Sequence, residues 1–313
     1  TADMRSLMNK PIRTLFTALF PLALVACDTS EAPKPEAHAE APIETGIIVT
    51  DWQQQSLEQF EQAAAHWQQA LVNLEQNKDE KNLAALRQSL ADWYHLFTEQ
   101  APLLNARACQ LNQQAILARM DTWPLYPGYI DSMPEWPESG LISDPYLELN
   151  RKNLRIQHGA TDSAEASLGF AAMLVVLNGT GETAKPLAFF QDEAQQAPRR
   201  LTYLKLAGEQ ILADYRTFAT EVSLVSSDLD CALSAMLERR QQLISSTDND
   251  SELVIPNTTR KTLSDIQLNA LQNLPESVVS AWEDVQPGIM EAITSSKNEG
   301  WKPIEEWQER TSE

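Results

Sequence analysis

Apolar residues recur at intervals of three and four along most of this chain, which is the spacing of one face of an α-helix. The pattern predicts long helices over residues 51–76, 79–100, 103–121, 162–179, 199–225, 228–245, 258–273 and 275–295, with a short helix over 144–155. In the last long helix the apolar stripe consists of Val278, Trp282, Val285, Ile289 and Ile293. No stretch shows the alternation of a β-strand. We therefore expect an all-α fold.

The predicted helices fall into two groups in chain order, about 51–180 and about 197–296. We expect them to form two packed helical-bundle halves of one domain over 51–296, joined by a central segment rich in proline and aromatic residues. The tail, 297–313, should be weakly structured, with Trp301 and Trp307 docking back on the body.

The first 26 residues have the features of a targeting signal. Lys10 and Arg13 precede an apolar run over 15–26, which is too short to span a membrane comfortably. The run ends in Leu24-Val25-Ala26-Cys27, which resembles a bacterial lipobox. Cys27 would then carry a diacylglycerol with palmitate-like acyl chains; the alternative is an ordinary secretory signal with a chance cysteine. Asp28 slightly favours retention in the inner membrane.

Residues 27–50 should form a disordered tether between this anchor and the folded body, because they are rich in Ala, Pro and Glu and lack an apolar period. Two further cysteines, Cys109 and Cys231, remain after lipidation of Cys27. In an oxidising periplasm they could pair, but the sequence does not show that they are close together. Two buried free thiols are the preferred interpretation.

The formal net charge of the chain is −20. Nucleic-acid binding requires a basic stripe against the phosphates, and no such stripe is present, so nucleic acid is excluded as a partner. Solubility explains the acidity; attraction of cations is the alternative, and charge alone implies no site for them.

Residues 123–179 are the part of the sequence that bundle packing does not explain. Four prolines, at positions 124, 127, 134 and 137, exclude a regular helix over 123–139. The side chains here could line a ligand-binding cleft between the halves, or they could pin a loop to the core. The candidate cleft residues are Trp123, Tyr126, Tyr129, Asp131 and Trp136, with Glu135 beside them.

A possible metal site lies a little further along. His158, Asp162 and Glu165 are spaced so that, on a helix, they would offer an imidazole and two carboxylates to iron or zinc. Gly159 argues against a continuous helix there. The alternative is that Asp162 caps the next helix, Glu165 is its first-turn acid and His158 is a loop residue. No cofactor is certain; iron and zinc are the candidates.

The order of these segments resembles the imelysin family, which includes iron-regulated periplasmic lipoproteins. The resemblance rests on WPLYPGYIDSMPEWPESGLI, GFAAMLVVLNG and RRLTYLKLAGEQILADYRTFA, and is strongest over 123–179. The family's hallmark is Gly-x-His-x-x-Glu on a helix. Alignment on Gly169 places Ala171 at the His position and Leu174 at the Glu position. Neither side chain binds metal or moves protons, so the resemblance implies the family's fold without metal-dependent enzyme activity.

We therefore expect a lipid-anchored protein on the periplasmic face of a bacterial cell envelope. The resemblance implies a non-enzymatic accessory or ligand-binding component of iron uptake, with another envelope protein of that system as a possible partner. The alternatives are a metal-dependent peptidase of the imelysin type and a structural partner of another envelope protein.

Overall fold

The computed structural model describes residues 46–47, 49–180, 184–220, 223–245 and 255–312. Helices dominate this part of the chain, and its only β-type pairings are two isolated bridges, Ile47 with Leu224 and Met133 with Trp136. The all-α prediction is confirmed. The signal segment, Cys27 and most of the tether lie outside the described residues. No helix among the described residues is both long and apolar enough to cross a membrane.

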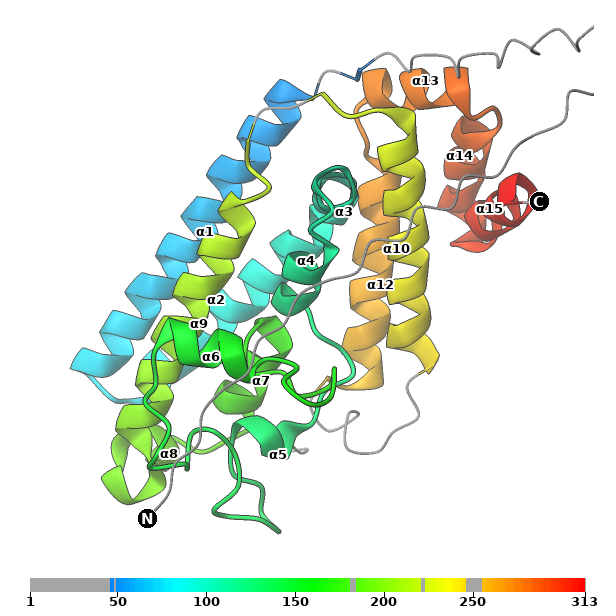
Figure 1. Ribbon diagram of the computed structural model, residues 1–313. Coiled ribbons are helices and arrows are strands. Elements are labelled where there is room, and N and C mark those ends of the chain that lie inside the picture. The colour runs from blue at the N-terminus through cyan, green and yellow to red at the C-terminus, as the bar shows by residue number, and fades with distance from the viewer. Residues whose placement is uncertain (1–45, 48, 181–183, 221–222, 246–254, 313) are drawn as a thin grey trace, which may run out of the picture. The chain divides into compact units, whose positions relative to one another are not determined.

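The first hydrophobic cluster is built around three long helices, α1 (Thr50–Gln76), α2 (Glu80–Glu99) and α9 (Ala197–Arg216), together with the short α7 (Phe170–Asn178). Figure 1 shows α1 and α9 running side by side, in agreement with their direct packing. Their close approach depends on Gly208 of α9, because a Cβ there would lie 2.6 Å from Nε1 of Trp67. This cluster therefore draws on both of the halves expected from chain order.

The second cluster is formed by α3 (Ala101–Leu111), α10 (Ser226–Ser245), α12 (Asn257–Gln272), α13 (Glu276–Val285), α14 (Ile289–Glu299) and α15 (Lys302–Ser312). Helix α3 contributes to both clusters, since Leu104 faces the first and Leu103 faces the second. The remaining elements are short: α4 (Gln114–Met120), α5 (Pro127–Ile130), α6 (Arg151–Gln157), α8 (Ala188–Gln191) and the 3-10 turn η1 (Glu193–Gln195).

Several predicted helices are broken or shortened. The helix expected over 275–295 is interrupted between α13 and α14, where Gly288 has φ +91° and Pro287 precedes it. Val285 is 45% exposed and does not belong to the stripe. The helix over 103–121 divides at Asn112, which adopts φ 52°. The helix over 199–225 ends at Arg216.

Both ends of the folded body are better ordered than the sequence predicted. The expectation of a weakly structured tail is wrong, because α15 covers most of it, while the docking of Trp301 and Trp307 is confirmed by their burial. At the other end Ile47 and Val49 are buried in the second cluster, so the last residues of the expected tether belong to the body.

The expectation of two free thiols is wrong, because Cys109 of α3 and Cys231 of α10 form a disulfide. Their Cα atoms lie 6.2 Å apart, although 122 positions separate them in sequence. Helices α3 and α10 pack along each other, which brings the two cysteines together. The bridge therefore joins one helix of the first expected half to one of the second.

Replacing both cysteines by alanine should lower the free energy of unfolding by about 2–5 kcal/mol, because the bridge closes a long loop in the unfolded chain. Denaturant titration of the wild type and of Cys109→Ala/Cys231→Ala measures this difference. A reducing agent serves as the control: it should destabilise the wild type and leave the double variant unchanged. Equal midpoints for the oxidised wild type and the double variant would show that the bridge contributes nothing.

Candidate functional site

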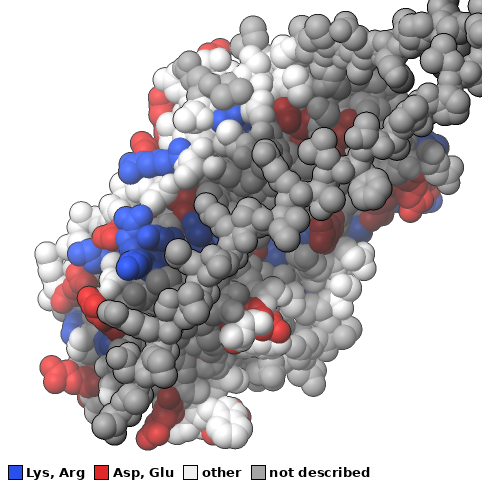
Figure 2. All heavy atoms as spheres, in the orientation of Figure 1, with Lys and Arg blue, Asp and Glu red and all other residues white. Residues whose placement is uncertain are grey.

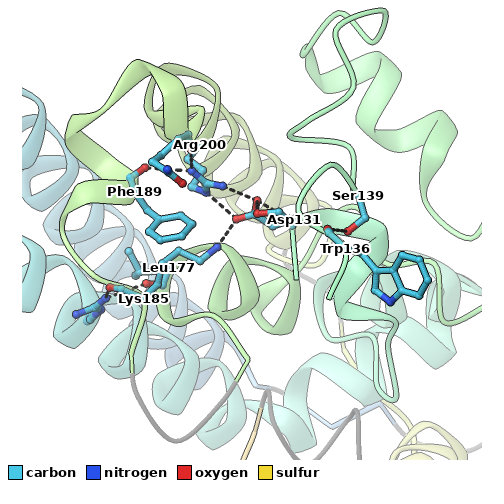
Figure 3. Close-up of polar contacts among 10 residues, drawn as sticks. Asp131, Trp136, Ser139, Leu177, Lys185, Phe189 and Arg200 are labelled. Carbon is cyan, nitrogen blue, oxygen red and sulfur yellow. Dashed lines mark hydrogen bonds and ion pairs between the residues drawn. The ribbon is translucent and has the colours of Figure 1, made fainter. Parts of the chain in front are cut away.

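The most unusual feature of the central segment is the buried carboxylate of Asp131, which follows directly after α5 and has no exposed surface. Arg200 binds it with two hydrogen bonds, from Nε to Oδ2 at 2.7 Å and from Nη2 to Oδ1 at 2.8 Å. The ammonium of Lys185 also donates to Oδ2. Figure 3 shows the three side chains converging from separate segments. We call Asp131, Lys185 and Arg200 the buried ion cluster.

Neighbouring groups hold the two cations in place. Both cations lie over the ring of Phe189, whose centroid is 5.3 Å from Nζ of Lys185 and 4.9 Å from Cζ of Arg200. Arg200 also donates from Nη1 to the carbonyl of Phe189. Arg87 of α2 donates to the carbonyls of Leu177 and Lys185, which fixes the backbone at the lysine.

The buried ion cluster carries one more positive than negative charge. Burial alone would raise the pKa of Asp131, but the hydrogen bond from Arg200 and the charges of both cations outweigh it, and this pKa lies below its ordinary value. The pKa of Lys185 is also lowered, chiefly by burial; Asp131 opposes that effect, and the charge of Arg200 adds to it. One carboxylate is thus shared between two cations.

The preceding residue, Arg199, fixes the outer part of the same segment. Its guanidinium donates to four backbone carbonyls, those of Leu141, Ile142, Asp144 and Leu147, at 2.6–3.1 Å. Adjacent arginines in the first turn of α9 therefore hold two parts of one irregular loop. Cations are unfavourable at a helix N-terminus, so their presence there reflects these long-range partners.

The loop held in this way exposes two aromatic side chains. Trp136 is 69% exposed and Tyr146 is 96% exposed. In Figure 3 the indole of Trp136 points away from the buried ion cluster. The neighbouring carboxylates of Glu135, Glu138 and Asp144 are exposed as well. We call these five residues the acidic-aromatic surface.

A pocket of about 640 Å³ lies at this surface, bordered by Glu138, Asp144 and Tyr146, with Arg200 at one side. The stretch 123–150 contains no Lys or Arg, so the positive charge beside its carboxylates comes from another segment, from Arg199 and Arg200 of α9. Figure 2 shows Lys and Arg side chains gathered on the left of the visible face, whereas Asp and Glu side chains are scattered over several parts of it.

The structure does not gather the five residues of the expected cleft around one cavity. Trp123 and Asp131 are buried, and Arg260 lies over the Trp123 ring at 5.9 Å. Tyr129 is half-buried and donates its hydroxyl to the carbonyl of Gln157. Tyr126 and Trp136 are exposed. Trp123, Tyr129 and Asp131 hold the segment on the body, and Trp136 faces outward.

His158, Asp162 and Glu165 do not converge on a metal position either. The Nε2 atom of His158 lies 3.1 Å from the hydroxyl of Thr122. Glu165 accepts hydrogen bonds from the amide and hydroxyl of Thr161, and Asp162 accepts from the amide of Ala164. No group of three or more His, Cys, Asp or Glu side chains among the described residues could hold a metal ion.

The alternative interpretation of the same three residues is right for His158, which lies outside a helix, and wrong for Asp162 and Glu165. Helix α7 begins at Phe170, so Asp162 closes a turn in an irregular segment and does not cap a helix. The helix expected over 144–155 likewise begins later, at Arg151, with Asn150 as its N-cap.

Gly169, Ala171 and Leu174 serve the packing of α7. Gly169 has φ +101°, and a Cβ there would lie 2.5 Å from the carbonyl oxygen of Arg119. Ala171 is buried in the first cluster, and Leu174 packs against it partly buried. No protein-family model matches this chain, and a comparison with curated proteins finds no match. The resemblance to the imelysin family stays a prediction.

Asp131→Asn should destabilise the fold by about 3–5 kcal/mol, because it leaves two buried cations without their carboxylate. Thermal or denaturant unfolding measures the loss. Adding Lys185→Met to Asp131→Asn should restore part of it, since one of the two cations is then gone. Glu138→Gln is the exposed control and should change little. A wild-type melting temperature for Asp131→Asn would contradict this account of the cluster.

His158 should make stability depend on pH. Burial and the charge of Arg119 lower its pKa from 6.5 to about 4, with Asp214 opposing. Between these pH values the unfolded chain binds a proton that the folded chain excludes, so stability is full above pH 6.5 and falls toward pH 4. The loss should reach roughly 2–3 kcal/mol.

Unfolding measured at several pH values in the wild type and in His158→Gln tests this. The variant should lose that part of the pH dependence, whereas His66→Gln, an exposed control, should keep it. Identical pH profiles for all three proteins would refute the role of His158.

Proposed function

We propose that this chain is a non-enzymatic accessory protein of a bacterial cell envelope, lipid-anchored at Cys27, that binds a basic surface of another envelope protein. The observation that carries the proposal is the acidic-aromatic surface, a rigidly held loop with Trp136 and Tyr146 largely exposed. Large aromatic side chains contribute most to protein–protein binding where they enter pockets of a partner.

The rigidity of the loop supports recognition of this kind. Arg199 binds four of its carbonyls, and the buried ion cluster holds its other part at Asp131. A loop fixed before binding loses little conformational entropy when a partner arrives, so more of the contact energy remains as affinity.

The charge of the surface defines the partner. Glu135, Glu138 and Asp144 surround the aromatic side chains, and none of them forms an ion pair within the described structure. A partner with Lys or Arg at its rim would be attracted to them and oriented by them. The overall charge of −20 acts in the same direction at longer range.

The setting in iron uptake rests on the resemblance to the imelysin family. The non-enzymatic assignment rests on Ala171 and Leu174, which stand as apolar packing residues at the two positions where the family's motif has His and Glu. A bare iron or zinc ion would be repelled by the excess positive charge of the buried ion cluster.

Deletion of the gene should impair growth under iron limitation, and the wild-type chain should restore it. Trp136→Ser/Tyr146→Ser should fail to restore growth although it folds normally, because both side chains are exposed. Ile156→Ser/Ile244→Ser, which also removes two exposed apolar side chains, is the matched control and should restore growth. Normal growth of the deletion strain would refute the role in iron uptake.

A photo-crosslinking amino acid at position 146 identifies the partner. We expect one dominant crosslinked envelope protein, with a yield that falls as salt rises and falls further with Glu135→Lys/Glu138→Lys. A yield insensitive to both salt and charge reversal would refute the acidic-aromatic surface as the binding site.

A further inference from the structure

A second pocket lies next to the buried ion cluster. Its volume is about 350 Å³, within the range of about 300–1,000 Å³ found for small-molecule sites. It shares Ser132, Pro137 and Gln195 with the pocket of about 640 Å³ at the acidic-aromatic surface. Its remaining lining is Met133, Pro134, Gly179, Thr180, Lys185, Pro186 and Phe189. The described walls are thus mostly apolar, and Lys185 is the one charged residue among the lining residues that the structure describes.

Lys185 is well placed to bind an anion at this pocket. Its side chain is 6% exposed, and its ammonium has three N–H donors. Asp131 is the one acceptor that it reaches among the described residues, and Arg200 already occupies both oxygens of that carboxylate. The ammonium of Lys185 therefore has N–H donors left for a further acceptor. One bound negative charge would also balance the net positive charge of the buried ion cluster.

We propose that this pocket binds a small organic monocarboxylate, with its carboxylate on Lys185 and its apolar part against Phe189, Met133 and the prolines. A single negative charge matches the excess of one positive charge in the cluster. An apolar body matches the walls better than a fully hydrated ion such as phosphate does. None of the five residues of the acidic-aromatic surface lines this pocket, so the proposal goes beyond the proposed docking function.

Calorimetry of the purified full-length chain with benzoate tests the proposal. We expect saturable binding of one benzoate per chain with a dissociation constant of roughly 1 mM or tighter. Benzamide, which has the same shape without the charge, and inorganic phosphate should each bind at least about tenfold more weakly. Equal binding of benzoate and benzamide, or no saturable benzoate binding at all, would overturn the proposal.

Two variants locate the site. Lys185→Met should weaken benzoate binding at least about tenfold, and it leaves Asp131 and Arg200 as a neutral pair, so the fold should persist. Lys152→Met, at an exposed position on α6, is the matched control and should bind as the wild type does. Unchanged binding by a folded Lys185→Met would place the ligand elsewhere and refute the assignment.

Pro134→Glu provides an independent check if Lys185→Met does not fold. Pro134 is exposed and borders the pocket, so a carboxylate there should repel benzoate and weaken binding severalfold without disturbing the core. Wild-type affinity in this variant would count against the pocket. Trp136→Ser/Tyr146→Ser should bind benzoate normally, which separates failure of this site from failure of the proposed docking function.

Discussion

The salt link between Asp131 and Arg200 is the constraint on which the central part of the structure depends. A carboxylate without exposed surface must be paired, and a bidentate guanidinium is the partner that satisfies both of its oxygens. Because Arg200 lies in the first turn of α9, this pairing fixes the loop to one of the helices of the first cluster. The neighbouring Arg199 then orders backbone that has no helical hydrogen bonds of its own.

We infer that the buried ion cluster contributes more to the placement of the loop than to the stability of the fold. An apolar core of the same volume would often be equally stable, but it would not position one loop so closely. Lys185 adds a second cation to a carboxylate that Arg200 already pairs, and this leaves the cluster with a net positive charge. A positive excess away from water, beside a pocket with apolar walls, distinguishes this group from a simple structural pair.

Periodicity predicted the helical fold because an apolar stripe is a local property of the sequence. It did not predict the breaks at Asn112 and before Gly288, since the stripe can continue in register across a kink. The helix expected from Asp162 was too long for a related reason: the apolar residues before Phe170 are buried although they are not helical. The apolar pattern there predicted the burial of these residues correctly and their backbone conformation wrongly.

The candidate site was predictable only in part, because its essential contacts are long-range. Asp131 and Trp136 stood out in a proline-rich segment, but Lys185 and Arg200 lie 54 and 69 positions from Asp131. The disulfide partners are 122 positions apart. Pairing over such distances leaves no pattern in one sequence. The available signal was the pair of arginines at the start of α9, where acidic residues are normally favoured.

The pairing of Ile47 with Leu224 has a mechanical consequence. Tension applied to the chain at its N-terminal side enters the described fold at this bridge, before it reaches α1. The hydrogen bonds between the two residues pass the load to the connection that precedes α10. From α10 the covalent link between Cys231 and Cys109 passes it to α3. A pull from the N-terminal side would thus be shared between both hydrophobic clusters for as long as this bridge holds, and α1 alone would carry it only after the bridge breaks.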